Sequence, residues 1–248
     1  MSRLAMTIAA FLLVAAPVPA AAQQSSTPTT ITPKDIEGIV RDYLLKHPEI
    51  IVEALDAYKR RADEARRDAV RQTISQRMDS IQNDPDSPVG GNPKGDVTLV
   101  EFFDYRCGVC KRVHGTVVEL LKGDSNIRRV YKEWPILGPE SVFATRAALA
   151  ARAQGKYLAF HDALMEHRGA LTPEQVMLIA GSIGIDAKRL RADMKAPGID
   201  AIIRKNYELA EALKITGTPS FIIGDQLIPG AADLDSLKSI VQKARTKG

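Results

Sequence analysis

The residues of this chain best suited to covalent chemistry are two cysteines three positions apart. They lie in the segment Cys107-Gly108-Val109-Cys110, and the chain contains no third cysteine. A single pair so close together cannot join distant parts of a fold, but its sulfurs can pass a disulfide to another molecule or take one from it. The pair follows an apolar run typical of a buried strand, 97–103, and opens a helical run, 111–121. A C-x-x-C segment between a strand and a helix predicts thiol–disulfide exchange.

The two cysteines are predicted to have different roles. Cys107 would lie at the N-terminus of the helix, where unpaired N–H groups and the helix dipole favour an anion. The pKa of a free cysteine is about 8.5, and sites of this kind lower it to ~3.5–7.5. Cys107 is therefore expected to be the attacking thiolate, and Cys110, one turn deeper, the resolving thiol. Arg106 adjoins Cys107, but a solvated surface charge is the role expected of its side chain.

The first residues have the composition of a secretory signal. Arg3 precedes an apolar run, 8–16, and Ala20-Ala21-Ala22 offers a cleavage site. A membrane-spanning helix needs about 20 apolar residues, so this run is too short to form one. The pattern predicts a signal peptide over 1–22, removed on export to the periplasm, and a flexible polar N-terminus over 23–31.

An all-helical oligomerisation region is predicted over 32–82. Thr32-Pro33 is typical of a capped helix start, and 49–82 contains neither glycine nor proline. One helix of roughly 50 Å is therefore expected from Pro48 to Gln82. Its apolar residues have the spacing of a coiled-coil seam, which favours self-association; the alternative is one amphipathic helix packed on its own domain. The seam comprises Ile51, Leu55, Tyr58, Ala62, Ala65 and Ala69, and after a shift of one residue it resumes at Val70, Ile74, Met78 and Ile81.

The remaining elements predict an α/β protein with a thioredoxin fold and an inserted helical domain. Residues 83–95 are rich in proline and glycine, and would form a linker and the first strand region. Residues 96–138 and 214–248 read as strand, helix and strand, then a hairpin and a final helix. Residues 139–213 read as almost wholly helical, so they would form the inserted domain.

The composition is that of a globular protein, with 45% hydrophobic and 26% charged residues and a net charge of +4. The basic residues form no stripe interleaved with aromatic residues, so nucleic acid is not an expected partner. No cofactor is expected.

Two motifs together resemble the DsbA family of periplasmic disulfide oxidoreductases. They are 101–111, Glu-Phe-Phe-Asp-Tyr-Arg-Cys-Gly-Val-Cys-Lys, and 217–221, Gly-Thr-Pro-Ser-Phe; the resemblance covers about 87–244. It implies that Pro219 is cis and faces the active-site disulfide, and that Thr218 binds substrate backbone. The Gly-Val dipeptide departs from the Pro-His of the strong oxidases, which bears on how far the pKa of Cys107 falls.

Glu101 matches the family's buried acid beneath the second cysteine, which takes and gives protons during exchange. The alternative is a strand carboxylate paired with a neighbouring base such as Lys132, and the two roles are compatible. The resemblance thus implies a site without a metal, with catalytic residues Cys107, Cys110 and Glu101 and substrate-binding residues Thr218 and Pro219.

The N-terminal helices are similar to those of the ScsC-like subgroup, some of whose members are trimers with isomerase activity. This resemblance implies a homo-oligomer, with a trimer as one form, that acts as a thiol:disulfide oxidoreductase or isomerase. The expected partners are cysteine-containing secreted proteins and a membrane redox partner that recycles the site.

Three other hypotheses compete with disulfide exchange. A zinc site could use both cysteines and His114, but it lacks a second ligand pair, because His161 and His167 fit no standard finger spacing. Soft thiolates select Cu(I), so a copper-binding thiol protein for metal tolerance, without catalytic turnover, is the alternative function. The intact C-x-x-C and Gly-Thr-Pro motifs argue against a helical scaffold whose thioredoxin domain serves only for interactions.

Overall fold

The computed structural model describes residues 31–247, and these form two compact units that divide between Ala57 and Tyr58. The predicted signal peptide, 1–22, and nearly all of the predicted flexible segment lie outside the described residues, so both stay predictions. Within residues 31–247, no helix is long and apolar enough to span a bilayer.

The first unit contains α1, Pro33–Lys46, and the beginning of α2, Glu49–Gln76. Thr32 caps α1, since its hydroxyl accepts a hydrogen bond from the Asp35 N–H while the Asp35 carboxylate accepts one from the Thr32 N–H. This reciprocal capping fixes the helix start that Thr32-Pro33 predicts. Large apolar side chains of both helices are exposed, namely Ile36, Ile39, Val40, Tyr43, Leu45, Ile51, Val52 and Leu55.

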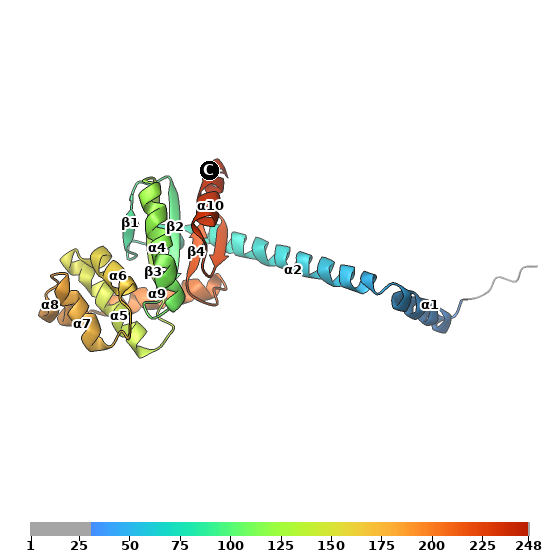
Figure 1. The fold of residues 1–248 in the computed structure, drawn as a ribbon, viewed down its shortest axis with the longest axis horizontal. Helices are drawn as coiled ribbons and strands as arrows, with labels where there is room; N and C mark the ends of the chain where they lie inside the picture. The colour runs from blue at the N-terminus through green and yellow to red at the C-terminus, as the bar shows by residue number, and fades with distance from the viewer. Residues whose placement is uncertain (1–30, 248) are drawn as a thin grey trace, which may run out of the picture. The chain divides into compact units, whose positions relative to one another are not determined.

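The second unit is built on a five-stranded sheet of order β1-β3-β2-β4-β5 (Figure 1). β2 and β3 are parallel, and each of the other neighbouring pairs is antiparallel. The two parallel strands are buried nearly throughout; the apolar composition of β2 predicts this, whereas β3 buries charged residues as well. The strands are β1 Val89–Gly91, β2 Val97–Phe103, β3 Ile127–Glu133, β4 Ser220–Ile223 and β5 Gln226–Pro229.

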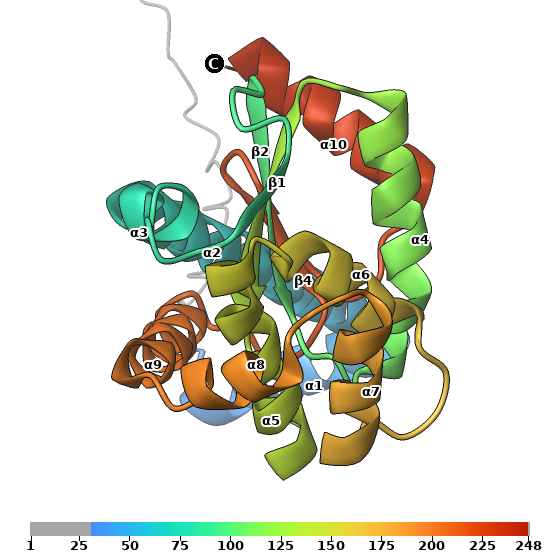
Figure 2. The same cartoon turned by 90° about the vertical axis from the view of Figure 1, so that its left-hand side faces the viewer.

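Helices cover both faces of this sheet (Figure 2). On one face, Leu99 and Phe221 pack with α4, Gly108–Gly123, and α10, Leu234–Lys247. On the other face, Phe102 packs with the end of α2, with α3, Met78–Gln82, and with α9, Pro197–Ala212. The sheet between these two layers of helices is the predicted thioredoxin fold.

A helical block follows β3 and has a core of its own. It consists of α5 Pro139–Ala150, the 3-10 turn Ala151–Gln154, α6 Tyr157–Glu166, α7 Pro173–Ser182, α8 Ala187–Asp193 and α9. Phe160, Leu164 and Val176 are fully buried in this core, which also includes Cys107 and Cys110. The cysteine pair therefore lies where the helical block meets the sheet domain.

The long helix differs from its prediction in two respects. α2 ends at Gln76 and α3 begins at Met78, so the helix expected over 48–82 is interrupted. Ile74 and Ile81 are fully buried against the sheet, because the shifted part of the seam faces the domain core. The alternative of packing on its own domain therefore holds for this part, and residues 58–82 belong to the second unit.

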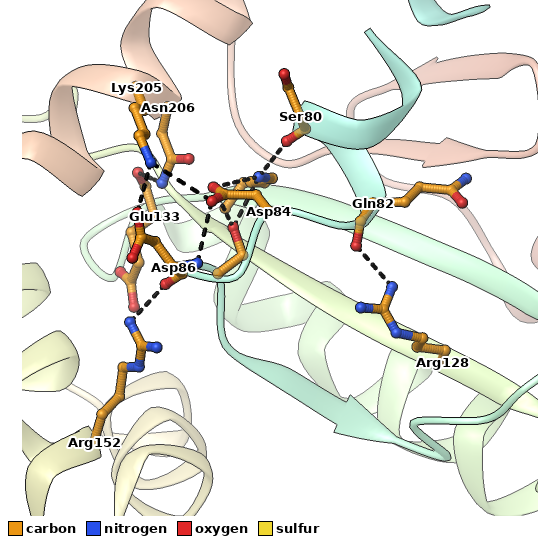
Figure 3. A network of polar contacts seen from close by, with 11 residues as sticks. Ser80, Gln82, Asp84, Asp86, Arg128, Glu133, Arg152, Lys205 and Asn206 are labelled. Atoms are coloured by element: carbon orange, nitrogen blue, oxygen red, sulfur yellow. Dashed lines mark hydrogen bonds and ion pairs between the residues drawn. The ribbon is translucent and has the colours of Figure 1, made fainter.

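The segment that follows α3 is tied to the sheet domain by a polar network (Figure 3). The Arg128 guanidinium donates to the Gln82 carbonyl at 2.8 Å, and that of Arg152 donates to the Asp86 carbonyl at 2.6 Å. Lys132, buried in β3, donates to acceptors of 80–87: the Ser80 carbonyl (2.7 Å), the Ser87 hydroxyl (2.8 Å) and the Asp84 carboxylate (3.3 Å). The proline- and glycine-rich segment is thus held against the sheet and, through Arg152, against the helical block.

Candidate active site

Cys107 lies at the start of α4, as its position in the sequence predicts. It is the N-cap residue, with an extended backbone, and its sulfur accepts a hydrogen bond from the Cys110 N–H at 3.3 Å. A thiolate here is therefore held by one of the amides that the helix leaves unpaired. When protonated, the sulfur donates to the Thr218 carbonyl at 3.2 Å, which brings the two halves of the predicted site together.

The surroundings of Cys107 favour its thiolate. The pKa of Cys107 is lowered to about 5, chiefly because the Cys110 thiol donates a hydrogen bond to its sulfur, and burial opposes this. The pKa of Cys110 is raised well above its usual range by the same hydrogen bond and by burial. At pH 7, Cys107 is therefore ionised, whereas Cys110 is a protonated thiol with no exposed surface.

This difference predicts one thiolate titration in the acid range. In the reduced protein, the ultraviolet absorbance of the thiolate should rise as the pH increases through about 5, and then stay at one thiolate per chain to neutral pH. Cys107→Ser should lose the step, and Cys110→Ala should move it to higher pH because the hydrogen-bond donor is gone. If the unaltered protein titrates instead near pH 8.5, about the pKa of a free cysteine, the surroundings of Cys107 do not stabilise its thiolate.

Glu101 lies in β2 and forms a buried ion pair with Arg129 of β3. The Arg129 Nη2 and Glu101 Oε2 atoms are 2.6 Å apart, and the side chains are 2% and 1% exposed. Burial raises the pKa of Glu101, and the charge and hydrogen bond of Arg129 oppose that rise. The pKa of Cys110 is raised mainly by its hydrogen bond to Cys107 and by burial, and the charge of Glu101 raises it further. The acid and the second cysteine are thus electrostatically coupled.

The base paired with Glu101 is Arg129 and not Lys132, the residue suggested by the sequence. The parallel register sets Glu101 opposite Tyr131 and sets Lys132 one residue further along. Because side chains of a strand alternate between the two faces, Arg129 shares the face of Glu101 and Lys132 points to the other. Lys132 binds residues of 80–87 instead.

The loop before β4 lies against the cysteines. The Thr218–Pro219 peptide bond is cis, as the resemblance implies. Pro219 is buried, Thr218 is partly buried, and the Ser220 hydroxyl donates to the Gly217 carbonyl at 2.8 Å. The structure therefore brings Thr218 and Pro219 to Cys107, although the cysteine and the loop are about a hundred residues apart in the sequence.

Asp104 is a residue of the site that the sequence analysis did not single out. It is fully buried, and its carboxylate accepts hydrogen bonds from the Arg106 N–H (2.7 Å), the Ser141 hydroxyl (2.8 Å), the Ile136 N–H (2.8 Å) and the Leu137 N–H (3.0 Å). These bonds fix the turn between β2 and Cys107. An aspartate directly after a strand is a signal for such a turn, because its side chain binds the backbone two residues on.

Two cations beside the cysteines are bound locally. Arg106, expected to be a solvated charge, donates to the Glu140 carboxylate at 3.0 Å. Lys111 donates to the carbonyls of Leu164 (2.6 Å) and His167 (2.9 Å), and burial lowers the pKa of Lys111 to about 8. Both side chains tie the start of α4 to the helical block.

Two family descriptions match this chain. A DSBA-like thioredoxin domain matches residues 98–242, more than half of the chain. The chain belongs to the DsbA-like thioredoxin family. The matched part of this DsbA-like protein contains Cys107, Cys110, Thr218 and Pro219. A copper resistance protein ScsC N-terminal domain matches residues 34–65, which confirms the resemblance of the N-terminal helices.

Solved structures of related proteins have the same fold. A thioredoxin-like oxidoreductase from Silicibacter pomeroyi is 50% identical, with a TM-score of 0.67 over 68% of this chain and 97% of its own. The thiol-disulfide exchange protein alpha-DsbA2 from Wolbachia pipientis is 35% identical, with a TM-score of 0.68 over 72% and 97%. ScsC from Proteus mirabilis is 29% identical, with a TM-score of 0.66 over 87% and 97%.

Some relatives matched by sequence are much longer proteins. The chain spans a quarter of the length of an Na(+)/H(+) antiporter NhaA from Salinispora arenicola, which is 30% identical over 65% of this chain. The DsbA-like fold is therefore also found as one part of larger proteins.

Proposed function

We propose that this DsbA-like protein is an enzyme that exchanges disulfides with substrate proteins through Cys107. The observation that carries the proposal is the position of the Cys107 sulfur, which caps α4 and lies 3.2 Å from the Thr218 carbonyl. A thiolate at this position is both a nucleophile at neutral pH and a good leaving group. The loop of Thr218 and Pro219 is the surface on which we place the substrate backbone.

In the reduced protein, the Cys107 thiolate attacks a substrate disulfide. A bond forms between Cys107 and one substrate sulfur, and the other substrate sulfur leaves as a thiolate. Cys110 then loses its proton and attacks the Cys107 sulfur, which releases the substrate thiolate and leaves a Cys107–Cys110 disulfide. The reverse sequence donates a disulfide to a dithiol substrate. We place Glu101 as the acceptor of the Cys110 proton, because burial raises its pKa.

We further propose that the enzyme acts in the periplasm, which the predicted signal peptide supports. Disulfides persist in that compartment, so secreted proteins that contain cysteines are the substrates we infer. A membrane redox partner would then return the Cys107–Cys110 pair to its working state.

We also propose that the protein assembles into an oligomer, with a trimer as one form, and that this assembly favours disulfide isomerisation. Ile51 and Leu55 are 46% and 53% exposed, and Ile36 and Val40 of α1 are 52% and 49% exposed. Burying such side chains against copies of the same helices would remove apolar area from water. Each Å² buried would stabilise the oligomer by about 25 cal/mol. The match of residues 34–65 to an ScsC N-terminal domain supports this region as the one that associates. Joined catalytic domains would raise the effective concentration of one site near a substrate held by another, which favours isomerisation.

A charge placed on the exposed apolar seam tests this assembly. In light scattering, Leu55→Glu should reduce the oligomer to monomers, because the seam would have to bury a carboxylate. Ala57→Glu is the matched control: it adds the same charge two residues on, on the opposite side of the helix, and should stay oligomeric. A substitution is preferable to truncation near Ser87, which would remove the core residues Ile74 and Ile81.

The same variants separate oligomerisation from isomerisation. We expect Leu55→Glu to reactivate scrambled ribonuclease more slowly than Ala57→Glu, while both reduce insulin equally well. A monomeric unaltered protein at micromolar concentration would refute the oligomer. Equal reactivation by a monomeric Leu55→Glu variant would refute the link to isomerisation alone.

Copper binding without turnover is the alternative with less support. The copper resistance protein ScsC N-terminal domain matches residues 34–65, and this segment contains no cysteine. The match therefore provides no sulfur ligand for copper. The two sulfurs also differ in state, because the pKa of Cys107 is lowered and that of Cys110 is raised. Such a pair suits successive attack better than joint ligation.

A further inference from the structure

A cluster of two histidines and an aspartate lies next to the cysteine pair, between α4 and α6. His114 belongs to α4, and His161 and Asp162 belong to α6. One possible ligand atom from each of these residues lies within 4.8 Å of the others. His114 follows Cys110 by four residues, so the two side chains share one face of the helix. The cluster contains neither of the cysteines on which a zinc site was considered from the sequence.

His114 is the residue of this cluster whose surroundings are unusual. It is 4% exposed, and neither Nδ1 nor Nε2 has a hydrogen-bond partner. Nε2 is 3.6 Å from Oδ1 of Asp162, which is too long for a hydrogen bond. Nearly all buried polar groups in native proteins have a partner, and an exception points to a bound ion, a water or a functional role.

His161 is oriented so that one nitrogen carries the lone pair that a metal would need. Its Nδ1 lies 3.1 Å from the Tyr105 hydroxyl, which itself donates to the Glu133 carboxylate at 3.0 Å. Because Tyr105 gives its proton to Glu133, its oxygen accepts the Nδ1–H of His161, and Nε2 keeps its lone pair. Metal-bound histidines commonly have such a partner on the other nitrogen, since it fixes both tautomer and orientation. In this structure Nε2 accepts a hydrogen bond from Arg129 at 3.4 Å, which a metal at Nε2 would replace.

Three cations and two carboxylates surround the cluster. The cations are Arg129, Lys111 and Arg168, all close enough to act on the His114 ring. Of these cations, Arg129 is compensated by Glu101 at 2.6 Å. Asp162 supplies the negative charge, and its side chain is 49% exposed, which gives an ion a path from solvent.

We propose that His114, His161 and Asp162 bind a divalent transition-metal ion of the zinc class. Two imidazoles and a carboxylate are a ligand set of this class, and a water from the exposed side of Asp162 completes a tetrahedron. Bonds of ~2.0–2.2 Å set tetrahedral ligand atoms about 3.4 Å apart, so the 3.6 Å between His114 and Asp162 is already close. The ion joins α4 to α6 behind the cysteine pair.

The test uses the full mature chain, without an affinity tag, with Cys107 and Cys110 both replaced by serine. Titration with Co²⁺ should give the intense visible bands of a tetrahedral ion, at one ion per chain, and Zn²⁺ should displace it. Asp162→Asn should weaken Co²⁺ binding by about 100-fold or more, since loss of even an outer-shell partner commonly costs 10–100-fold. His167→Ala is the matched control, and it should bind Co²⁺ as tightly as its parent.

Asp162→Asn decides the question, because it conserves volume at a half-exposed position and its circular dichroism can be matched to that of its parent. His114→Ala should lose the same bands, and it serves as a second variant. Absence of tetrahedral bands at millimolar Co²⁺ would overturn the proposal. So would equal affinity in Asp162→Asn, or binding that appears only when both cysteines are present.

Discussion

Replacing Cys107 with serine should abolish disulfide exchange, leaving only the rate seen without protein. Serine cannot form the thiolate that the N-cap position stabilises at pH 7. Cys110 cannot take over, because its sulfur is fully buried and its pKa is raised. The measurement is the rate of insulin reduction by the reduced protein in the presence of a thiol donor.

Two features of this experiment separate chemistry from folding. Serine is a good N-cap residue, so Cys107→Ser should keep α4 and lose little or no free energy of unfolding. Cys110→Ala keeps the nucleophile and should still react once with a substrate disulfide, but it cannot resolve the product. Exchange above background in a folded Cys107→Ser variant would contradict the assignment of the two cysteines.

Replacing Arg129 with methionine should destabilise the protein by about 3–5 kcal/mol. The substitution leaves the Glu101 carboxylate, 1% exposed, without its partner at 2.6 Å. Removing one member of a buried ion pair costs this much because the other charge stays desolvated. The free energy of unfolding in urea, measured on the reduced protein at pH 7.5, gives the loss directly.

The double variant Glu101→Leu/Arg129→Met is the matched comparison. Replacing both charges with apolar side chains should restore most of the lost stability, because no unpaired charge is left. In Arg129→Met alone, the pKa of Glu101 should rise further. The loss should then be small below the raised pKa of Glu101 in the unaltered protein, where both folded proteins hold a protonated Glu101, and grow as the pH rises through that pKa. A loss under about 1 kcal/mol at pH 7.5 would show that the pair does not hold β2 to β3.

The strands and the cysteine site could be predicted because their signals are local. Val97–Phe103 and Ile127–Glu133 are the runs expected from the sequence, and the first is nearly continuous in apolar residues, as is usual for a buried parallel strand. Cys107 at a helix start follows from the strand before it and the helical run after it. The cis bond before Pro219 could be predicted only from the family resemblance, because an X-Pro bond is cis in only about 5% of cases.

The other features depend on strand register and on contacts distant in sequence. Lys132 is the wrong partner for Glu101 because side chains alternate along a strand, which places Arg129 on the face of Glu101. Ile74 and Ile81 have the same spacing whether they face a partner helix or the sheet, so periodicity alone could not assign them to the core. The cluster of His114 with His161 joins two helices whose packing no sequence pattern reveals.

Cys107 as the attacking thiol is tested most directly by mapping the bond formed when the Cys110→Ala variant meets a disulfide-bonded peptide. We expect a mixed disulfide between the peptide and Cys107, identified by mass spectrometry of the trapped complex. We also expect the rate of trapping to fall as the pH is lowered through the pKa of Cys107. In this variant that pKa lies above 5, because the Cys110 thiol that donates to the Cys107 sulfur is gone. No covalent complex in a folded protein, or a rate that rises only near about pH 8.5 as for a free cysteine, would contradict this role of Cys107.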